Sequence, residues 1–313
     1  MDRLPPELIS QIVTLLPRSD ILVVRQTSKY IESSSFDHFA HLFFRKRGFM
    51  ITTESLNVLT SISRHHGLCK HVQHLWFNPD CFTFVNNPFW TLDSDDEEPT
   101  PRYEDQMRRA RLFDEYVHDH WDLLYSSRLQ EILAEVFKSL PMLRTVGMRR
   151  GTYKPYGWQT VSNNVGLDPR ILGGEVSLYT TAFADPTYLF IAIIKALATS
   201  RKRIRRLYTD AIQIDHVDQR LMLSESDCRH ALDSVQYVEI NATGLPEARD
   251  VTDPSALRGT GKHASNLETL LGSMHELLEI GMTIFRDPKQ RHMIPPEPRR
   301  LQSYVTPAKM TFH

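Results

Sequence analysis

The chain of 313 residues is 41% hydrophobic and 24% charged, which predicts a folded, soluble protein of one large domain or two smaller ones. Its 37 Lys and Arg residues balance 38 Asp and Glu residues, so the net charge of -1 argues against non-specific attraction to nucleic acid or to an anionic membrane. We therefore expect no nucleic acid and no membrane as partners, and a protein partner instead.

The sequence predicts an intracellular protein. The longest apolar stretch, residues 188–198, is too short for a membrane span and contains Lys195. The start of the chain lacks the charged and apolar segments of a secretion signal. Cys69, Cys81 and Cys228 are odd in number and far apart, so we expect reduced thiols. These features favour a cytoplasmic or nuclear location.

The first predicted helix begins at Pro5 and Pro6 and ends at Pro17. Prolines in the first turn lose no hydrogen bond, and Glu7 suits the positive end of the helix. Apolar residues recur at spacings of three and four in a stripe that is wider than one packing face. The stripe consists of Leu8, Ile9, Ile12, Val13, Leu15 and Leu16.

Two shorter helices are predicted next. Ser19 or Asp20 can cap the second helix, and Ser28 can begin the third. Three short helices cannot bury so wide a stripe among themselves, because a chain below about 40 residues rarely has enough interior to stand alone. Part of the stripe therefore needs a partner, which is either the rest of this chain or a second protein.

The order and spacing of these residues resemble the F-box, especially as found in filamentous fungi. The matching segments are Leu4-Pro5-Pro6-Glu7-Leu8, Ile12, Leu15-Leu16-Pro17, Asp20-Ile21-Leu22 and Arg25-Gln26-Thr27-Ser28-Lys29-Tyr30. The resemblance implies an amino-terminal three-helix F-box module over residues 1–50. It also implies a Skp-type adaptor protein as partner and, through it, a cullin. By position, the adaptor-binding residues are Leu4, Pro5, Leu8, Ile12, Leu16 and Leu22.

One apolar pattern recurs in the remainder of the chain, and its last part is the strand signature of leucine-rich repeats. Most occurrences follow a helix-like stretch, which predicts parallel strands with helices on the outer face. The strands are predicted around Leu75, Val146, Leu207, Val238 and Ile280. This spacing is wider and less even than the 20–29 or so residues of regular repeats.

The predicted fold class is mixed α and β: the F-box followed by an irregular leucine-rich-repeat-like solenoid. The solenoid would span residues 51–313 as the target-binding domain. Its acidic run Asp93–Glu98 predicts a disordered insertion at residues 86–105, and residues 151–175 are predicted to form a loop.

Three residues are predicted to contact the target. In a parallel repeat sheet, the residues between the apolar strand positions face the open, concave surface. Trp, Tyr and Arg carry much of the binding energy at protein interfaces. We therefore predict Trp76, Arg206 and Tyr208 as target-binding residues. The alternative is that they are ordinary sheet residues covered by a loop.

No catalytic, cofactor or metal site is recognisable. Gly259–His263 resembles a phosphate-binding loop, but Ala256 and His263 stand where Gly and Ser or Thr are needed. The histidines near His71 and His118 lack the cysteine pair or carboxylate set that would complete a metal site. The basic run Arg201–Arg206 is either a nuclear import signal or a set of cations suited to a helix carboxyl end.

The sequence therefore predicts a non-enzymatic substrate-recognition subunit of a Skp/cullin/F-box type ubiquitin ligase, with an unknown protein target and no cofactor. One competing hypothesis is a non-catalytic interaction scaffold that uses the F-box-like helices without ubiquitination. Another is an enzyme built on an α/β sheet, which requires a pocket of polar groups that the sequence does not reveal.

Overall fold

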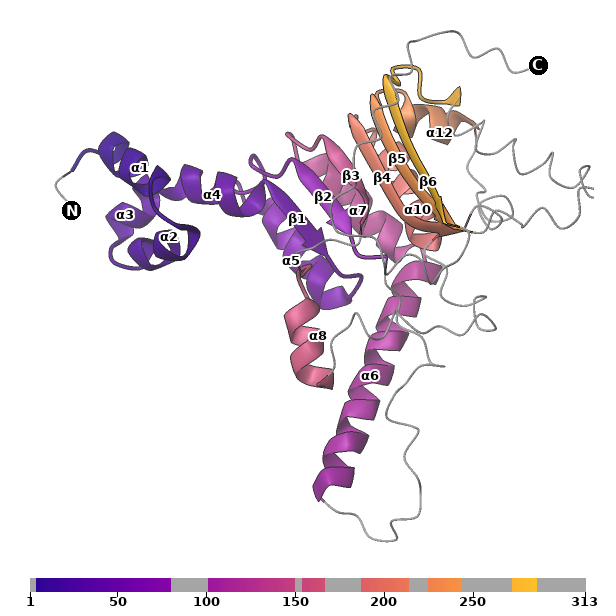
Figure 1. Ribbon diagram of the computed structural model, residues 1–313, viewed down its shortest axis with the longest axis horizontal. Helices are drawn as coiled ribbons and strands as arrows, with labels where there is room; N and C mark the ends of the chain where they lie inside the picture. The colour runs from indigo at the N-terminus through magenta and orange to yellow at the C-terminus, as the bar shows by residue number, and fades with distance from the viewer. Residues whose placement is uncertain are drawn as a thin grey trace, which may run out of the picture.

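The computed structural model describes residues 4–79, 101–149, 154–166, 187–213, 225–243 and 272–285. These residues form a group of short helices at the amino-terminal end and a six-stranded parallel sheet with its own helices (Figure 1). The predicted mixed α and β class is confirmed. No helix in this part of the chain is long and apolar enough to cross a membrane.

The amino-terminal helices are α1 (Pro6–Thr14), α2 (Arg18–Arg25), α3 (Lys29–Ser34) and α4 (Phe36–Phe44). The prediction for Ser28 is confirmed, because its side chain accepts a hydrogen bond from the Ile31 amide and caps α3. The prediction for the second helix is wrong. It begins at Arg18, where the carbonyl of Pro17 accepts bonds from two following amides and no side chain is needed as a cap.

The strands are β1 (Lys46–Phe49), β2 (His74–Phe77), β3 (Thr145–Met148), β4 (Arg206–Gln213), β5 (Tyr237–Thr243) and β6 (Glu279–Phe285). They lie side by side in chain order, and every neighbouring pair is parallel. Strands β2 to β6 are those that the recurring apolar pattern predicts. β1 was not predicted, and it adds one strand at the edge next to the amino-terminal helices.

Helices cover one face of this sheet. α5 (Thr53–Arg64), α7 (Arg128–Ser139), α10 (Thr187–Ser200) and α12 (Glu225–Leu232) lie between successive strands in the sequence and on the same side of the sheet (Figure 1). Alternate strand residues point into the shared core, so Leu75, Val146, Leu207 and Val238 are buried against these helices. The residues between them consequently point to the opposite face.

A long helix, α6 (Pro101–Tyr125), extends away from the sheet, and α8 (Trp158–Val165) packs along it (Figure 1). α6 begins inside the range predicted as a disordered insertion; residues 86–100 of that range lie outside the described residues. The Asp119 carboxylate of α6 accepts a bond of 2.6 Å from the Thr53 amide at the start of α5. The His120 ring bonds the Ile51 carbonyl at 2.9 Å. These contacts fix the base of α6 to the sheet domain.

Candidate protein-binding surfaces

The amino-terminal helices bury one side of their apolar stripe within their own core. Ile9, Val13, Ile21 and Ile31 are at most 3% exposed and pack together. The partly buried side chains around them are Leu4, Leu16, Val24, Phe39, Leu42 and Phe43. Every member of this core lies between residues 4 and 43, so it is closed without any residue from the sheet domain.

The other side of the stripe lies in solvent, as do apolar side chains of α2 and α3. Leu15 is 85% exposed, Val23 is 63% exposed, and Leu8 and Leu22 are each 44% exposed. Isolated exposed apolar residues are common, but a group on three consecutive short helices is typical of a surface that binds another protein. The exposed group also includes Ile12 of α1 and Tyr30 of α3, each of which is 37% exposed.

Specific polar contacts hold the helices in one arrangement. Arg25 of α2 lies 4.0 Å from the centre of the Phe39 ring and donates to the Glu32 carbonyl at 2.8 Å. Burial lowers the pKa of Arg25, and the charge of Glu32 partly opposes that change. The Tyr30 hydroxyl donates to the Leu4 carbonyl at 2.8 Å and ties α3 to the start of α1. The exposed apolar residues therefore stand on a fixed platform.

A second surface is the face of the sheet opposite its helices. The strand register aligns the side chains of this face in two rows that run across the strands. The first row is Lys46, His74, Thr145, Arg206, Tyr237 and Glu279. The second row is Gly48, Trp76, Gly147, Tyr208, Glu239 and Gly281. We call this surface the open face.

The open face brings the three predicted target-binding residues together. Trp76 and Tyr208 are half-buried in the second row, and Arg206 is exposed in the first. The Trp76 indole leans over Gly48, where an added Cβ would collide with its ring. The glycine at this position of β1 therefore leaves room for the indole in its present place. The role of the three residues in target binding stays a prediction.

Aromatic rings and cations are in contact on this face. The Tyr208 and Tyr237 rings lie 5.7 Å apart. The guanidinium of Arg149 lies 5.5 Å from the centre of the Tyr208 ring, and that of Arg206 lies 5.8 Å from the Tyr237 ring. Such cation–π contacts hold arginine side chains against the sheet while their charges stay in solvent. Arg149 was not predicted, because it follows the last apolar position of its strand.

Two pKa values report the charge distribution of the open face. Burial, and then the charges of Lys46, Arg45, Arg206 and Arg144, lower the pKa of His74 to about 4. Burial, followed by the charge of Glu239, raises the pKa of Tyr237 to about 12. The strands from β1 to β4 thus carry the positive half of the face, and β5 and β6 carry the negative half.

Comparison with known families concerns the first of these two surfaces. Residues 1–36 match the family model of the F-box domain. These residues, which include α1, α2 and α3, are an F-box domain, and α4 follows it. F-box domains bind Skp-type adaptors within ubiquitin ligase complexes. The match covers the amino-terminal end of a 313-residue chain and does not extend into the sheet domain. No curated protein matches the chain.

Within the F-box, the predicted adaptor-binding residues separate into two groups. Pro5, Leu8, Ile12 and Leu22 are exposed and lie on α1, α2 or directly before them. Leu4 and Leu16 are half-buried and pack against the F-box core instead. Leu15, Val23 and Tyr30 are also exposed, but they were not among the predicted adaptor-binding residues.

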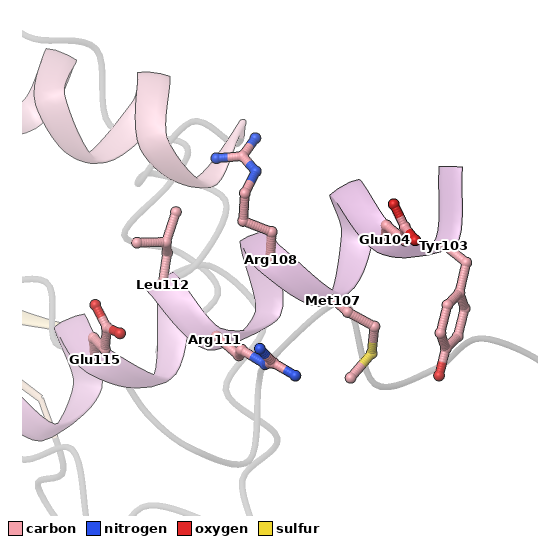
Figure 2. Close-up of a pocket in the computed structure, with 7 residues that line it drawn as sticks. All are labelled: Tyr103, Glu104, Met107, Arg108, Arg111, Leu112 and Glu115. Atoms are coloured by element: carbon pink, nitrogen blue, oxygen red, sulfur yellow. The ribbon is translucent and has the colours of Figure 1, made fainter. Parts of the chain in front are cut away.

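A shallow pocket also lies along α6. It is lined by Tyr103, Glu104, Met107, Arg108, Arg111, Leu112 and Glu115 (Figure 2). Figure 2 shows Arg108 and Leu112 pointing away from Met107 and Tyr103. Ligand sites bring a few polar groups together at one point in an apolar cavity. These side chains diverge around one helix, so the pocket does not have that character.

The described residues hold no cluster of three or more His, Cys, Asp or Glu side chains that could bind a metal ion. His118 bonds the Asp114 carbonyl at 2.7 Å within α6. Gly259–His263 lies outside the described residues. Lys202, from the basic run, donates to the Leu140 carbonyl at 2.5 Å at the end of α7. This contact places one cation of the run at the carboxyl end of α7, and the two interpretations of the run stay predictions.

Proposed function

We propose that this chain is the substrate-recognition subunit of a Skp/cullin/F-box type ubiquitin ligase and has no catalytic role itself. The F-box would bind the adaptor, the adaptor would connect it to the cullin, and the sheet domain would hold a protein target. Ubiquitin transfer would take place elsewhere in the assembly. Such a subunit would work in the cytoplasm or the nucleus.

The observation that carries this proposal is the division of the F-box stripe into a closed core and an exposed remainder. Ile9 and Val13 are enclosed by residues of the F-box and α4, whereas Leu8 and Ile12, on the same helix, remain 44% and 37% exposed. Fully burying a Leu or Ile side chain contributes about 1.5–3 kcal/mol. A partner that covers several of these partly exposed side chains would thus gain several kcal/mol.

The exposed residues are the ones we assign to the adaptor interface. Pro5, Leu8, Ile12 and Leu22 contact the adaptor in this proposal, and Leu15 and Val23 extend the same surface. Leu4 and Leu16 pack on the F-box core and hold the helices that carry this interface in place. We also propose that this F-box is of the filamentous-fungal type.

The sheet domain is proposed to be an irregular leucine-rich-repeat-like solenoid that binds the target. Its support is the chain order of the parallel strands, with the described helices that connect them on one face (Figure 1). The open face carries Trp76, Arg206 and Tyr208, which are residue types enriched at binding hot spots. We therefore place the target on this face.

The proposal is tested by co-purification of the Skp-type adaptor and cullin with the full chain. The variant Leu8→Ser/Ile12→Ser removes exposed apolar groups without opening the core, so it should fold normally and recover roughly tenfold less adaptor. The matched control, Met142→Ser/Leu278→Ser, changes two exposed apolar residues outside the F-box that are 38% and 76% exposed. Adaptor recovery from this control should equal that of the native chain.

Equal adaptor recovery from both variants would overturn the proposal. Recovery of neither adaptor nor cullin from the native chain would favour the scaffold hypothesis, in which the F-box binds another helical protein without ubiquitination.

A further inference from the structure

Exposed cations surround the His74 imidazole at this end of the sheet: Lys46 and Arg206 belong to the first row, and Arg144 lies next to that row, directly before β3. Lys46 begins β1, Arg144 directly precedes β3, and Arg206 begins β4. All three are exposed, and each contributes to the lowered pKa of His74 on β2. Within the described chain, none of them forms an ion pair with a carboxylate. Their charges are therefore available to a ligand.

A buried hydroxyl lies in the same row. Thr145 stands between His74 and Arg206 in the register and is 4% exposed. Its Oγ1 has no hydrogen-bond partner in the structure. Buried polar side-chain atoms are normally paired, so this hydroxyl is an unsatisfied polar group beneath the first row.

The second row contains two aromatic side chains. Trp76 on β2 and Tyr208 on β4 stand on either side of Gly147, which puts no side chain between them. Arg149 lies over the Tyr208 ring and adds a further exposed cation. An apolar side chain placed over Gly147 would have the Trp76 ring, which leans over Gly48, on one side and the Tyr208 ring on the other.

The negative half of the open face limits how far an anionic partner can extend. Glu239 on β5 and Glu279 on β6 would repel carboxylates that reached beyond β4. Strands lie about 4.8 Å apart, so the positive half, from β1 to β4, spans roughly 14 Å. About four or five extended residues cover that distance. A nucleic acid carries phosphates along its whole length, so some of them would lie over the negative half of the face. Nucleic acid therefore does not fit this pattern.

The cations are spread out: Lys46 on β1 and Arg206 on β4 stand three strands apart in the first row, and Arg144 lies directly before β3. Phosphate groups are typically bound where two or more guanidinium groups converge on one point. An extended segment with carboxylates on alternate residues has its negative charges spread out in the same way. Such a segment matches these separated cations better than a single phosphate group does.

We propose that the open face binds a short acidic segment of the target protein. Its carboxylates lie over Lys46, Arg144 and Arg206, and an intervening apolar side chain lies between Trp76 and Tyr208. This inference rests on the proposed function for the identity of the target, but binding of the segment does not require the adaptor. The two can therefore fail separately.

The test is fluorescence anisotropy of a labelled peptide with the full, purified chain. The probe is a peptide of about six residues that alternates glutamate with leucine, and the same peptide with glutamine in place of glutamate is the neutral comparison. The glutamate peptide should bind, and the glutamine peptide should bind at least roughly tenfold more weakly. Raising the salt from about 0.05 to about 0.5 M should weaken binding, because exposed charges are screened.

Variants locate the binding surface. Lys46→Gln/Arg144→Gln/Arg206→Gln should weaken binding of the glutamate peptide roughly tenfold or more, since each exposed ion pair contributes up to a few-fold. The matched control, Lys70→Gln/Arg111→Gln/Lys138→Gln, removes the same net charge from exposed residues elsewhere on the chain. Its affinity should stay within about twofold of the native chain.

Three results would overturn the proposal. One is the absence of binding by the glutamate peptide at low salt, and another is an equal loss of affinity in the two triple variants. The third is a phosphoserine version of the peptide that binds more than roughly tenfold tighter than the glutamate version, because it would assign the surface to phosphorylated segments. If peptide binding holds and adaptor binding fails, only the ubiquitin-ligase assignment is lost.

Discussion

Ile21 lies in the F-box core and Leu15 lies on its surface, so replacing each with alanine should have very different effects on the stability of the F-box. Ile21 is 1% exposed in the F-box core, whereas Leu15 is 85% exposed. Replacing a buried Ile with Ala costs about 2–5 kcal/mol, because the transfer energy is lost and a cavity remains. Ile21→Ala should thus destabilise the F-box by about 3 kcal/mol, and Leu15→Ala by less than about 0.5 kcal/mol.

Hydrogen exchange measures this difference within the F-box alone. A loss of about 3 kcal/mol raises the local opening constant roughly 150-fold, so the amide of Ile31 in α3 should exchange faster by that factor in Ile21→Ala. Exchange in β3 should change little, because the F-box core shares no residue with the core of the sheet domain. Equal effects of the two substitutions on α3 would refute the reasoning, as would equal acceleration in α3 and β3.

Three further predictions concern the open face. Gly48→Ala should displace the Trp76 indole and shift the ¹⁵N resonance of the indole NH. The control Gly281→Ala should leave that resonance in place, because the atom nearest to its new Cβ would be 3.7 Å away. Thr145→Val removes a buried hydroxyl without a partner, so thermal unfolding should show unchanged or higher stability, by up to about 1 kcal/mol; a clear loss would contradict this. Because the pKa of His74 is about 4 in the folded state, the unfolded state binds more protons than the folded state between about pH 6.5 and 4. The free energy of unfolding should therefore fall as the pH is lowered through that window. An NMR titration of the imidazole with a midpoint near 6.5 would contradict this prediction.

The sequence predicts the sheet well where each strand has its own apolar pattern. The core positions Leu75, Val146, Leu207 and Val238 alternate with polar residues, and the structure pairs them in the predicted order. β1 could not be found in this way, because Phe49 is the only large apolar residue in Lys46–Phe49. Its pairing depends on contacts with β2 that are far away in the sequence.

α8 was missed for a different reason. It lies inside the predicted loop at residues 151–175, and the glycines at its two ends favour a loop in any reading of the sequence alone. Gly157 and Gly166 have φ angles of 90° and 78° in the structure, so they bound the helix rather than interrupt it. Trp158 and Val161 then bury the helix against α6.

The candidate adaptor surface was only partly predictable. A stripe wider than one packing face shows that some residues stay exposed, but it does not show which ones. That choice depends on α4, whose Phe39 and Phe43 pack on the F-box core next to Leu16. Leu15 and Val23 are outside that core and lie in solvent. The open face was more accessible to prediction, because strand alternation alone places Trp76 and Tyr208 on one side.

The central claim is that a second protein covers the exposed half of the F-box stripe. Isothermal titration calorimetry of the full chain with a Skp-type adaptor, at several temperatures, tests it most directly. We predict a one-to-one complex with a negative heat-capacity change, because apolar surface is buried, and at least roughly tenfold weaker binding by Leu8→Ser/Ile12→Ser. An absence of binding, a heat-capacity change near zero or an unchanged affinity of this variant would contradict the account.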